Sequence, residues 1–212
     1  MDILIFDLDN TLYPAEKQLF NLIDVRINRY MTEIVGIPAP KVDALRREYW
    51  CKYGVTLQGL IRHHDVDPED YLSYVHDVDV RSRLQPDHTL REALHGLSQR
   101  KAVFTNGSVC HAQRVLGALG IEDMFEQIFD IRIAAYQPKP CVEPYHAVLA
   151  ELDAEPQRCV MIEDNRDNLK TAKNLGMGTV LVGVGATPAY VDVHLDSASQ
   201  ISQALQHWDQ AS

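Results

Sequence analysis

Two acidic residues close the first apolar run of the chain. The stretch ILIFDLDNTLYP, residues 3–14, places Asp7 and Asp9 two positions apart. Residues two apart in a strand point to the same face, so these carboxylates would repel each other and lose hydration at an interior site. A cation between them would remove that cost. The same letters also fit an ordinary strand that runs into an Asx-type turn at DNT.

Three further polar groups either follow a candidate strand directly or lie close to one in the sequence. They are Thr105-Asn106 after AVF, Lys139 within QPKP, and the pair Glu163-Asp164 after CVMI. Taken singly, each has a structural explanation. The threonine can cap a helix, the lysine can be a solvated loop cation, and the acidic pair can begin a helix. Their joint occurrence in this order favours a common site.

The elements that must position these groups alternate between strands and helices. Apolar runs typical of buried strands cover residues 3–6, 101–105, 128–134, 158–163 and 178–183. Helical patterns separate the later runs, at residues 108–119, 142–152 and 167–176. This alternation predicts an α/β fold with a doubly wound, Rossmann-like parallel sheet. Ligands of such sheets bind at the carboxyl ends of the strands, where Asp7, Asp9, Thr105 and Asp164 fall.

The alternation fails between the first strand and the second. Residues 15–88 show helical patterns only, at 15–34, 40–54 and 67–78, and Asp67-Pro68 is a typical start for the last of these. We therefore predict a core of residues 1–14 and 89–212 with an all-helical cap, residues 15–88, inserted after the first motif. The cap is a candidate lid; the alternative is an insertion that only adds stability.

Composition excludes several classes of protein. The chain has 212 residues, 46% of them hydrophobic, and a net charge of −10. The charge argues against a nucleic-acid polymer or an anionic membrane as partner. The four cysteines are scattered without a CxxC pair, which favours reduced thiols over a disulfide framework or a zinc site. We see no targeting segment and no run long enough to span a membrane, so we expect a cytoplasmic protein with a small-molecule substrate.

The motifs resemble those of the haloacid dehalogenase superfamily. Its hallmark is DxDx[TV], then a Ser or Thr, then a Lys, then an acidic pair, on such a sheet. More narrowly, DLDNTLYP, KYGVTLQGL, HAQRVLGALGIEDMF and KNLGM are similar to the pyrimidine 5'-nucleotidase branch. One departure is Glu163-Asp164-Asn165, where those nucleotidases commonly have Asp-Asp-Ser. A Glu-Asp pair also occurs in sugar-phosphate phosphatases and mutases of the superfamily.

The resemblance implies a Mg²⁺ ion and a covalent mechanism. The metal ligands would be the side chains of Asp7 and Asp164 and the backbone carbonyl of Asp9, with Glu163 as outer-sphere or occasional direct support. Magnesium prefers oxygen ligands and bridges to substrate phosphate, which agrees with these residue types. Asp7 would attack phosphorus and become an aspartyl phosphate.

The remaining motif residues would serve the proton and the phosphate. Asp9 would protonate the departing alcohol and then deprotonate the hydrolytic water. Thr105 and backbone amides such as that of Asn106 would hold phosphate oxygens, and Lys139 would balance the charge of Asp7 and the phosphoryl group. Asp9 disfavours a halide-releasing dehalogenase, because that reaction has no leaving alcohol to protonate.

The resulting prediction is a Mg²⁺-dependent phosphomonoesterase that hydrolyses pyrimidine nucleoside 5'-monophosphates. The alternatives are a broad-range or sugar-phosphate phosphatase and, in another class, a phosphate-sensing protein without turnover. The sheet domain would hold only the phosphoryl group, so the cap would have to select the substrate. Glu16, Lys17 and Phe20 are our first candidates for cap contacts with it.

Other residues leave alternatives open. No ligand spacing appears among the nine histidines, which favours surface or helix-packing roles for His63-His64. The aromatic group Tyr49, Trp50 and Tyr53 fits cap core or surface better than base stacking. Asp167 and Asn168 either cap the helix after the fourth strand or orient Asp164.

Overall fold

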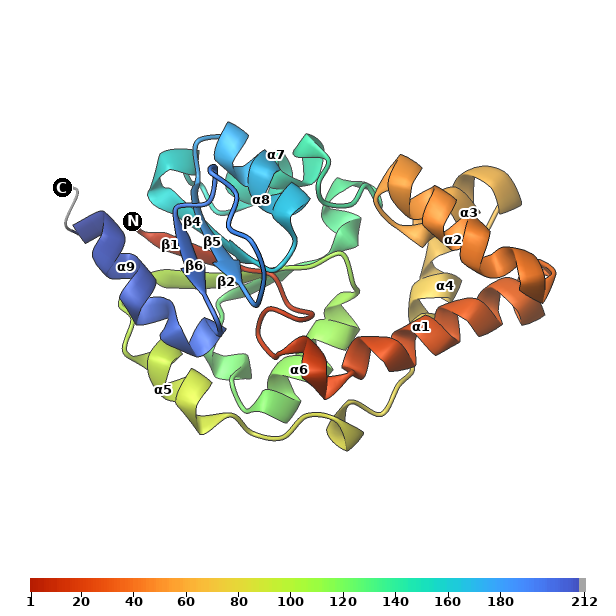
Figure 1. Ribbon diagram of the computed structural model, residues 1–212, viewed down its shortest axis with the longest axis horizontal. Coiled ribbons are helices and arrows are strands. Elements are labelled where there is room, and N and C mark those ends of the chain that lie inside the picture. Colours follow the sequence, from red (N-terminus) through yellow and green to blue (C-terminus); the bar gives the residue numbers. More distant parts are fainter. Residues whose placement is uncertain (210–212) are drawn as a thin grey trace.

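The computed structural model describes residues 1–209 and has two parts, a sheet covered by helices and a smaller bundle of helices (Figure 1). The strands are β1 (Ile3–Phe6), β2 (Arg100–Phe104), β3 (Gln127–Phe129), β4 (Cys159–Glu163), β5 (Gly178–Val182) and β6 (Val193–Leu195). The helices are α1 (Leu19–Arg29), α2 (Ala39–Tyr53), α3 (Thr56–His64), α4 (Pro68–Val75), α5 (His88–His95), α6 (Val109–Leu119), α7 (Val142–Glu151), α8 (Arg166–Asn174) and α9 (Ile201–Asp209).

The six strands form one parallel sheet in the order β3-β2-β1-β4-β5-β6. In the middle of the sheet, Ile5 pairs with Ala102 of β2 and with Met161 of β4. The chain builds outward on one side from β1 and on the other from β4, so the direction of winding changes between these two strands. This confirms the predicted doubly wound α/β fold, and it puts the expected ligand position at the ends of β1, β2 and β4.

Successive residues of β1 bury their side chains in two different hydrophobic cores. Leu4 and Phe6 pack with residues of α5, α6 and α9, whereas Ile3 and Ile5 pack with residues of α7 and α8. All four are buried, which explains why the strand is a continuous apolar run without a polar face. The helices of both faces hold the strand ends in fixed positions.

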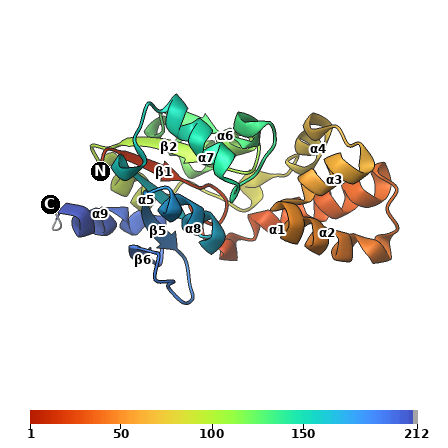
Figure 2. The same ribbon diagram turned by 90° about the horizontal axis from the view of Figure 1, so that it is seen from above.

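Helices α1 to α4 form the cap, which lies beside the sheet domain (Figure 2). The cap has its own core, which includes Ile27, Met31 and Leu60. On the return path, Val80 and Leu84 already pack into the core of the sheet domain. Judged by the core into which its residues pack, the cap therefore ends before residue 80. The predicted limit at residue 88 coincides instead with the start of α5.

Two predicted elements are wrong in part. The strand predicted at 128–134 ends at Phe129, because the Asp130 side chain accepts a hydrogen bond from the backbone N–H of Arg132 and begins a 3-10 helix, Ile131–Ala134. The helix predicted at 15–34 is interrupted at Gln18, whose left-handed φ of 55° separates the 3-10 helix Ala15–Lys17 from α1, and a π-helical turn, Tyr30–Ile34, follows.

Other local predictions are confirmed. The Asp67 side chain caps α4 by accepting from the N–H of Glu69 at 2.8 Å, and α2 ends at Gly54, where φ is 82°. The sequence patterns did not single out α3, α5, β6 or α9. Within residues 1–209, no helix has the length and apolar character needed to cross a membrane.

Candidate active site

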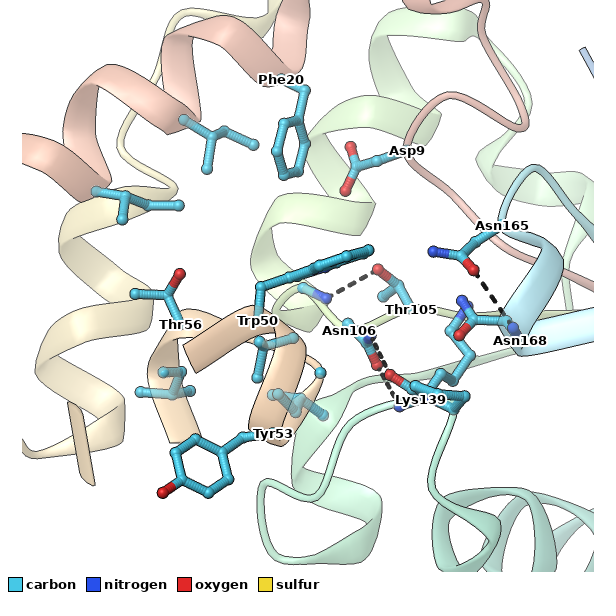
Figure 3. Close-up of a pocket in the computed structure, with 18 of the residues that line it drawn as sticks. Asp9, Phe20, Trp50, Tyr53, Thr56, Thr105, Asn106, Lys139, Asn165 and Asn168 are labelled. Atoms are coloured by element: carbon cyan, nitrogen blue, oxygen red, sulfur yellow. Dashed lines mark hydrogen bonds between the residues drawn. The ribbon is translucent and has the colours of Figure 1, made fainter. Parts of the chain in front are cut away.

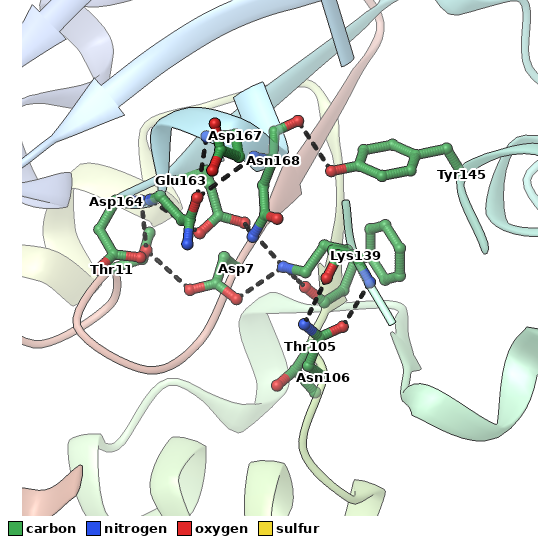
Figure 4. A network of polar contacts seen from close by, with 12 residues as sticks. Asp7, Thr11, Thr105, Asn106, Lys139, Tyr145, Glu163, Asp164, Asp167 and Asn168 are labelled. Atoms are coloured by element: carbon green, nitrogen blue, oxygen red, sulfur yellow. Dashed lines mark hydrogen bonds and ion pairs between the residues drawn. The ribbon is translucent and has the colours of Figure 1, made fainter. Parts of the chain in front are cut away.

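The predicted polar groups meet at the carboxyl edge of the three central strands (Figure 4). Asp7 directly follows β1, Thr105 directly follows β2, and Asp164 directly follows β4. Because β1 lies between β2 and β4, these residues are brought close together. Asp9 and Lys139 reach the same edge from loops, and all five line one cavity.

Lys139 is the central cation of the site. Its Nζ donates hydrogen bonds to Asp7 Oδ1 at 2.7 Å, to Glu163 Oε2 at 2.8 Å and to the carbonyl of Phe104 at 2.7 Å. Burial by itself lowers the pKa of Lys139, but the charges of Asp7 and Glu163 outweigh burial and hold the pKa above its usual value. The ammonium therefore stays charged and fixes the position of Asp7.

Asp7, Glu163 and Asp164 form a cluster whose oxygen atoms lie within 4.8 Å of one another. Burial, followed by repulsion from Glu163, raises the pKa of Asp7 to about 7, and burial raises the pKa of Glu163 to about 7 and of Asp164 to about 6. A single ammonium does not neutralise three carboxylates. The donor set of close, hard oxygen atoms fits a divalent cation such as Mg²⁺.

Glu163 is the least exposed of these acids and accepts three hydrogen bonds. The donors are Lys139, the side-chain amide of Asn168 at 3.0 Å and the backbone N–H of Asn165 at 3.1 Å. These contacts give Glu163 a supporting place behind the cluster. They also decide the alternatives for α8: Asn165 caps the helix, Asn168 holds Glu163, and the Asp167 side chain does neither.

Thr105 and Asn106 lie together but have different contacts. Thr105 Oγ1 lines the cavity and accepts from the N–H of Gly107 at 2.9 Å. The Asn106 side chain accepts from the backbone N–H of Lys139 at 2.8 Å and donates to its carbonyl at 3.1 Å. Its side chain thus fixes the loop that carries Lys139, which leaves the backbone amide as its possible contact with a bound anion.

Asp9 is held apart from the acidic cluster. Its Oδ1 accepts from Tyr13 Oη at 2.5 Å and from His111 Nε2 at 2.9 Å. Burial tends to raise the pKa of Asp9, but the charge and hydrogen bond of His111, together with the hydrogen bond from Tyr13, outweigh burial and hold the pKa below its usual value. Asp9 thus has hydrogen-bonding partners that Asp7 does not share.

The chain was compared with families of known proteins. The haloacid dehalogenase-like hydrolase family matches residues 1–176 of the chain. The chain belongs to the haloacid dehalogenase-like hydrolase family.

Proteins of similar sequence carry several different names. Phosphate metabolism protein 8 of Saccharomyces cerevisiae is 29% identical over 84% of this chain and 60% of its own length. Enolase-phosphatase E1 of Thioalkalivibrio sulfidiphilus is 35% identical over 58% of this chain and 51% of its own length, so the chain spans less than two thirds of either protein. β-Phosphoglucomutase of Bacillus subtilis is 26% identical over 99% of this chain and 96% of its own length.

A solved structure shows the same fold at low identity. The haloacid dehalogenase-like phosphatase from Thermococcus onnurineus superimposes with a TM-score of 0.66 over 97% of this chain and 98% of its own, at 17% identity. The likeness therefore extends to the cap as well as to the sheet domain.

The cavity of this haloacid dehalogenase-like protein lies between the strand edge and the cap (Figure 3). It has a volume of about 800 Å³, and cap residues form much of its wall. Phe20 and the exposed Trp50 belong to this lining. Glu16 and Lys17 are exposed on the 3-10 helix before α1 and do not belong to the lining, so the structure brings only one of the three predicted cap residues to the site.

The histidine pair of α3 packs against α2. His64 Nε2 is hydrogen-bonded to Tyr49 Oη at 2.9 Å, and His63 Nε2 to Tyr53 Oη at 2.8 Å. Tyr49 is buried in the cap core, whereas Tyr53 lines the cavity. The prediction of a helix-packing role for these histidines is confirmed.

The sequence patterns did not predict three side chains that contact Asp7 or Asp9, namely Thr11, Tyr13 and His111. Thr11 Oγ1 donates to Asp7 Oδ2 at 2.9 Å and accepts from the backbone N–H of Asp164 at 3.1 Å, so it joins the ends of β1 and β4. His111 contacts Asp9 and is fully buried. The signal for His111 was its place on the apolar side of α6, four residues before the buried Val115, where an unpartnered polar side chain would be costly.

Proposed function

We propose that the protein is a Mg²⁺-dependent phosphomonoesterase that works through an aspartyl-phosphate intermediate. The observation that carries this proposal is that the carboxylates of Asp7 and Asp9 have different surroundings. Asp7 lies in the acidic cluster with Lys139, and Asp9 lies outside that cluster with Tyr13 and His111. A nucleophile beside a metal and a separate proton carrier are the two carboxylates that such a hydrolysis needs.

The first half-reaction transfers the phosphoryl group to the protein. An Asp7 oxygen forms a bond to phosphorus while the bond from phosphorus to the ester oxygen breaks, and Asp9 gives its proton to that oxygen. Lys139 holds Asp7 in position for the attack. Thr105 and nearby backbone amides line the place where the phosphoryl oxygens would lie.

The second half-reaction returns Asp7 to its starting state. Water attacks phosphorus, its proton passes to Asp9, and the bond between phosphorus and the Asp7 oxygen breaks to release inorganic phosphate. When bound by Asp7, Asp164 and the Asp9 carbonyl, Mg²⁺ would supply positive charge to the phosphoryl oxygens.

We further propose pyrimidine nucleoside 5'-monophosphates as substrates. The volume of the cavity is in the range usual for small-molecule sites, which leaves room for a nucleoside beyond the phosphate. Trp50 and Phe20 offer aromatic surface on the cap side, and an aromatic ring can stack on any nucleobase. The proposal thus takes for Trp50 the base-stacking role that the sequence alone disfavoured. The nucleotidase-like motifs of the sequence support the same reading.

A sugar-phosphate phosphatase is the second candidate. The Glu163-Asp164 pair and the full-length similarity to β-phosphoglucomutase favour it. A binding protein without turnover is disfavoured, because phosphate binding alone does not require the separately held Asp9.

The experiment is a panel of phosphomonoesters assayed with Mg²⁺ and with a chelator. It comprises 4-nitrophenyl phosphate, uridine, cytidine and adenosine 5'-monophosphates, glucose 6-phosphate and glycerol 3-phosphate. We expect Mg²⁺-dependent release of phosphate, fastest from the pyrimidine nucleotides. A fastest rate on glucose 6-phosphate would favour the second candidate. No release from any ester with Mg²⁺ would contradict the phosphomonoesterase proposal itself.

A further inference from the structure

The two oxygen atoms of Asp9 have different surroundings. Oδ1 accepts from both Tyr13 Oη and His111 Nε2, and within the described residues Oδ2 has no hydrogen bond. Asp9 lines the cavity together with Phe20 and Thr105 (Figure 3). One oxygen is thus occupied by the protein while the other is left for a ligand.

This arrangement dictates where a proton on Asp9 must be. A carboxylate accepts at both oxygens, whereas a protonated carboxyl group carries one O–H donor. A proton on Oδ1 would face the Tyr13 and His111 donors, so it would cost at least one hydrogen bond. A proton on Oδ2 keeps both, and Oδ2 is the oxygen that a leaving group can reach.

The ring of His111 is fixed by its neighbours on the cap side. His76, just after α4, stacks on it with 4.7 Å between ring centroids and 15° between planes. His76 Nδ1 is in turn hydrogen-bonded to Ser108 Oγ at 3.0 Å. Burial, followed by the charge of His111, lowers the pKa of His76 to about 3, so a neutral ring lies against His111. With the ring held in this way, Nε2 of His111 lies 2.9 Å from Oδ1 of Asp9.

The contacts of His111 do not fit a purely structural histidine. A buried histidine normally has hydrogen-bond partners for both ring nitrogens. Among the side chains that the structure describes, His111 Nδ1 and Arg46 Nε are the buried nitrogens without one. The nitrogens of this fully buried ring therefore make one hydrogen bond, and its acceptor is Asp9.

We infer that His111 is a positioning residue for the proton carrier: with Tyr13, it holds Oδ1 of Asp9 so that Oδ2 carries the proton to and from substrate. As the ester bond breaks, the O–H bond at Oδ2 breaks and the proton goes to the leaving oxygen; in hydrolysis Oδ2 takes a proton from water. The inference rests on the proposed phosphomonoesterase function. It adds a residue from α6 and, through His76, a link to the end of the cap.

The test compares two leaving groups in variants of His111. His111→Phe keeps a ring for the stack but removes the donor, His111→Gln keeps an N–H near the position of Nε2, and His111→Asn is too short to reach. The substrates are 4-nitrophenyl phosphate, whose leaving group needs no proton, and the alkyl ester of the panel that the unaltered enzyme hydrolyses fastest. His146→Phe, an exposed histidine of α7, is the control.

We expect His111→Phe and His111→Asn to lower kcat for the alkyl ester about tenfold to hundredfold. For 4-nitrophenyl phosphate the loss should be less than about threefold, because its leaving group does not need a general acid. His111→Gln should recover most of the loss, and inhibition by inorganic phosphate should stay within about twofold throughout. If His111→Phe does not fold, the Gln and Asn variants make the same comparison.

Two outcomes would overturn the inference alone. One is an equal loss for both esters, and the other is a glutamine variant no more active than the asparagine variant. If the unaltered protein hydrolyses none of the esters, the proposed function fails and the inference falls with it.

Discussion

Glu69 at the start of α4 and Arg132 after β3 form a two-point ion pair that joins the cap to the sheet domain. Arg132 Nε donates to Glu69 Oε1 at 2.7 Å and Arg132 Nη2 donates to Oε2 at 2.6 Å. Tyr136 Oη donates to the same carboxylate at 2.6 Å. The cap is therefore held against the sheet domain by three hydrogen bonds to one carboxylate.

This contact should make stability depend on pH in a defined direction. The hydrogen bonds from Arg132 and then Tyr136 lower the pKa of Glu69 from 4.5 to about 2. A carboxylate whose folded pKa is depressed stabilises the protein above its unfolded pKa, and the effect is lost as the pH falls from about 4.5 to about 2. Because the pair is largely exposed, its contribution should be about 1 kcal/mol or less.

The measurement is the free energy of unfolding in urea across this pH window. Glu69→Gln should lower it at neutral pH, and the difference from the unaltered protein should shrink towards pH 2. Glu33→Gln serves as the control, because Glu33 is exposed and its side chain has no hydrogen bond or ion pair to the described part of the chain. A difference that stays constant with pH would show that Glu69 is not titrating in the pair.

Arg132 also shows where sequence reasoning stopped. It lies in the apolar run 128–134, whose composition favours a strand, but the local hydrogen bond to Asp130 turns the chain after three strand residues. The motif residues were predictable because a parallel sheet collects whatever follows its strands at one edge. Contacts such as that between Glu69 and Arg132 depend on how the cap and the sheet domain pack against each other, and no local sequence pattern predicts that packing.

The partners of Asp9 illustrate the same limit within the site. Tyr13 is four residues away along the chain, but His111 is 102 residues away and reaches Asp9 only through the rotation of α6 about its axis. The spacing of apolar residues predicted that helix and its end at Gly120. It did not predict which polar side chain on the buried side would face the first motif.

Replacement of Asp7 tests the nucleophile. Asp7→Asn should reduce turnover by several powers of ten for every ester, because an amide is a poor nucleophile and brings less charge to the metal. The measurement is phosphate release from 4-nitrophenyl phosphate at saturating Mg²⁺ by protein free of contaminating phosphatase. More than about a hundredth of the original turnover would contradict a covalent role.

Replacement of Asp9 tests the proton carrier. Asp9→Asn keeps the backbone carbonyl, so phosphate inhibition should change little while turnover of alkyl esters falls by about a hundredfold to ten-thousandfold. The loss should be smaller for 4-nitrophenyl phosphate, whose leaving group departs without protonation. Kinetics on both esters decide the point, since an equal loss would mean that Asp9 is not the acid.

Metal addition should stabilise the folded protein through the acidic cluster. A ligand that binds only the folded state stabilises it by RT ln(1 + c/Kd), where c is the free ligand concentration, so the melting temperature rises with that concentration. We expect Mg²⁺ to raise the melting temperature of the unaltered protein above that in NaCl of equal ionic strength. Asp164→Asn should remove most of this shift, whereas Asp196→Asn, an exposed aspartate outside the cluster, should keep it. An unaltered shift in Asp164→Asn would mean that the ion binds elsewhere.

Trp50 should decide which leaving group the cap accepts. Its side chain extends from α2 across the cavity towards Thr105 and Asn106 in Figure 3, and it is 57% exposed although it lines the pocket. An exposed aromatic ring at that place has little packing to lose, so its removal should act on substrate rather than on stability. Stacking on a base is worth about 1–3 kcal/mol, which corresponds to a factor of roughly 5 to 160 in kcat/KM.

We therefore expect Trp50→Ala to lower kcat/KM for pyrimidine nucleotides by that factor and to leave glucose 6-phosphate hydrolysis and phosphate inhibition nearly unchanged. Phe20→Ala should act in the same direction. Val25→Ala, an exposed residue of α1 outside the cavity lining, is the control for surface changes in the cap. The sheet domain holds only the phosphoryl group, which every phosphomonoester shares, so discrimination has to come from the cap. If Trp50→Ala scales all esters equally, the cap closes the site without selecting the nucleoside, and the nucleotidase proposal loses its structural basis.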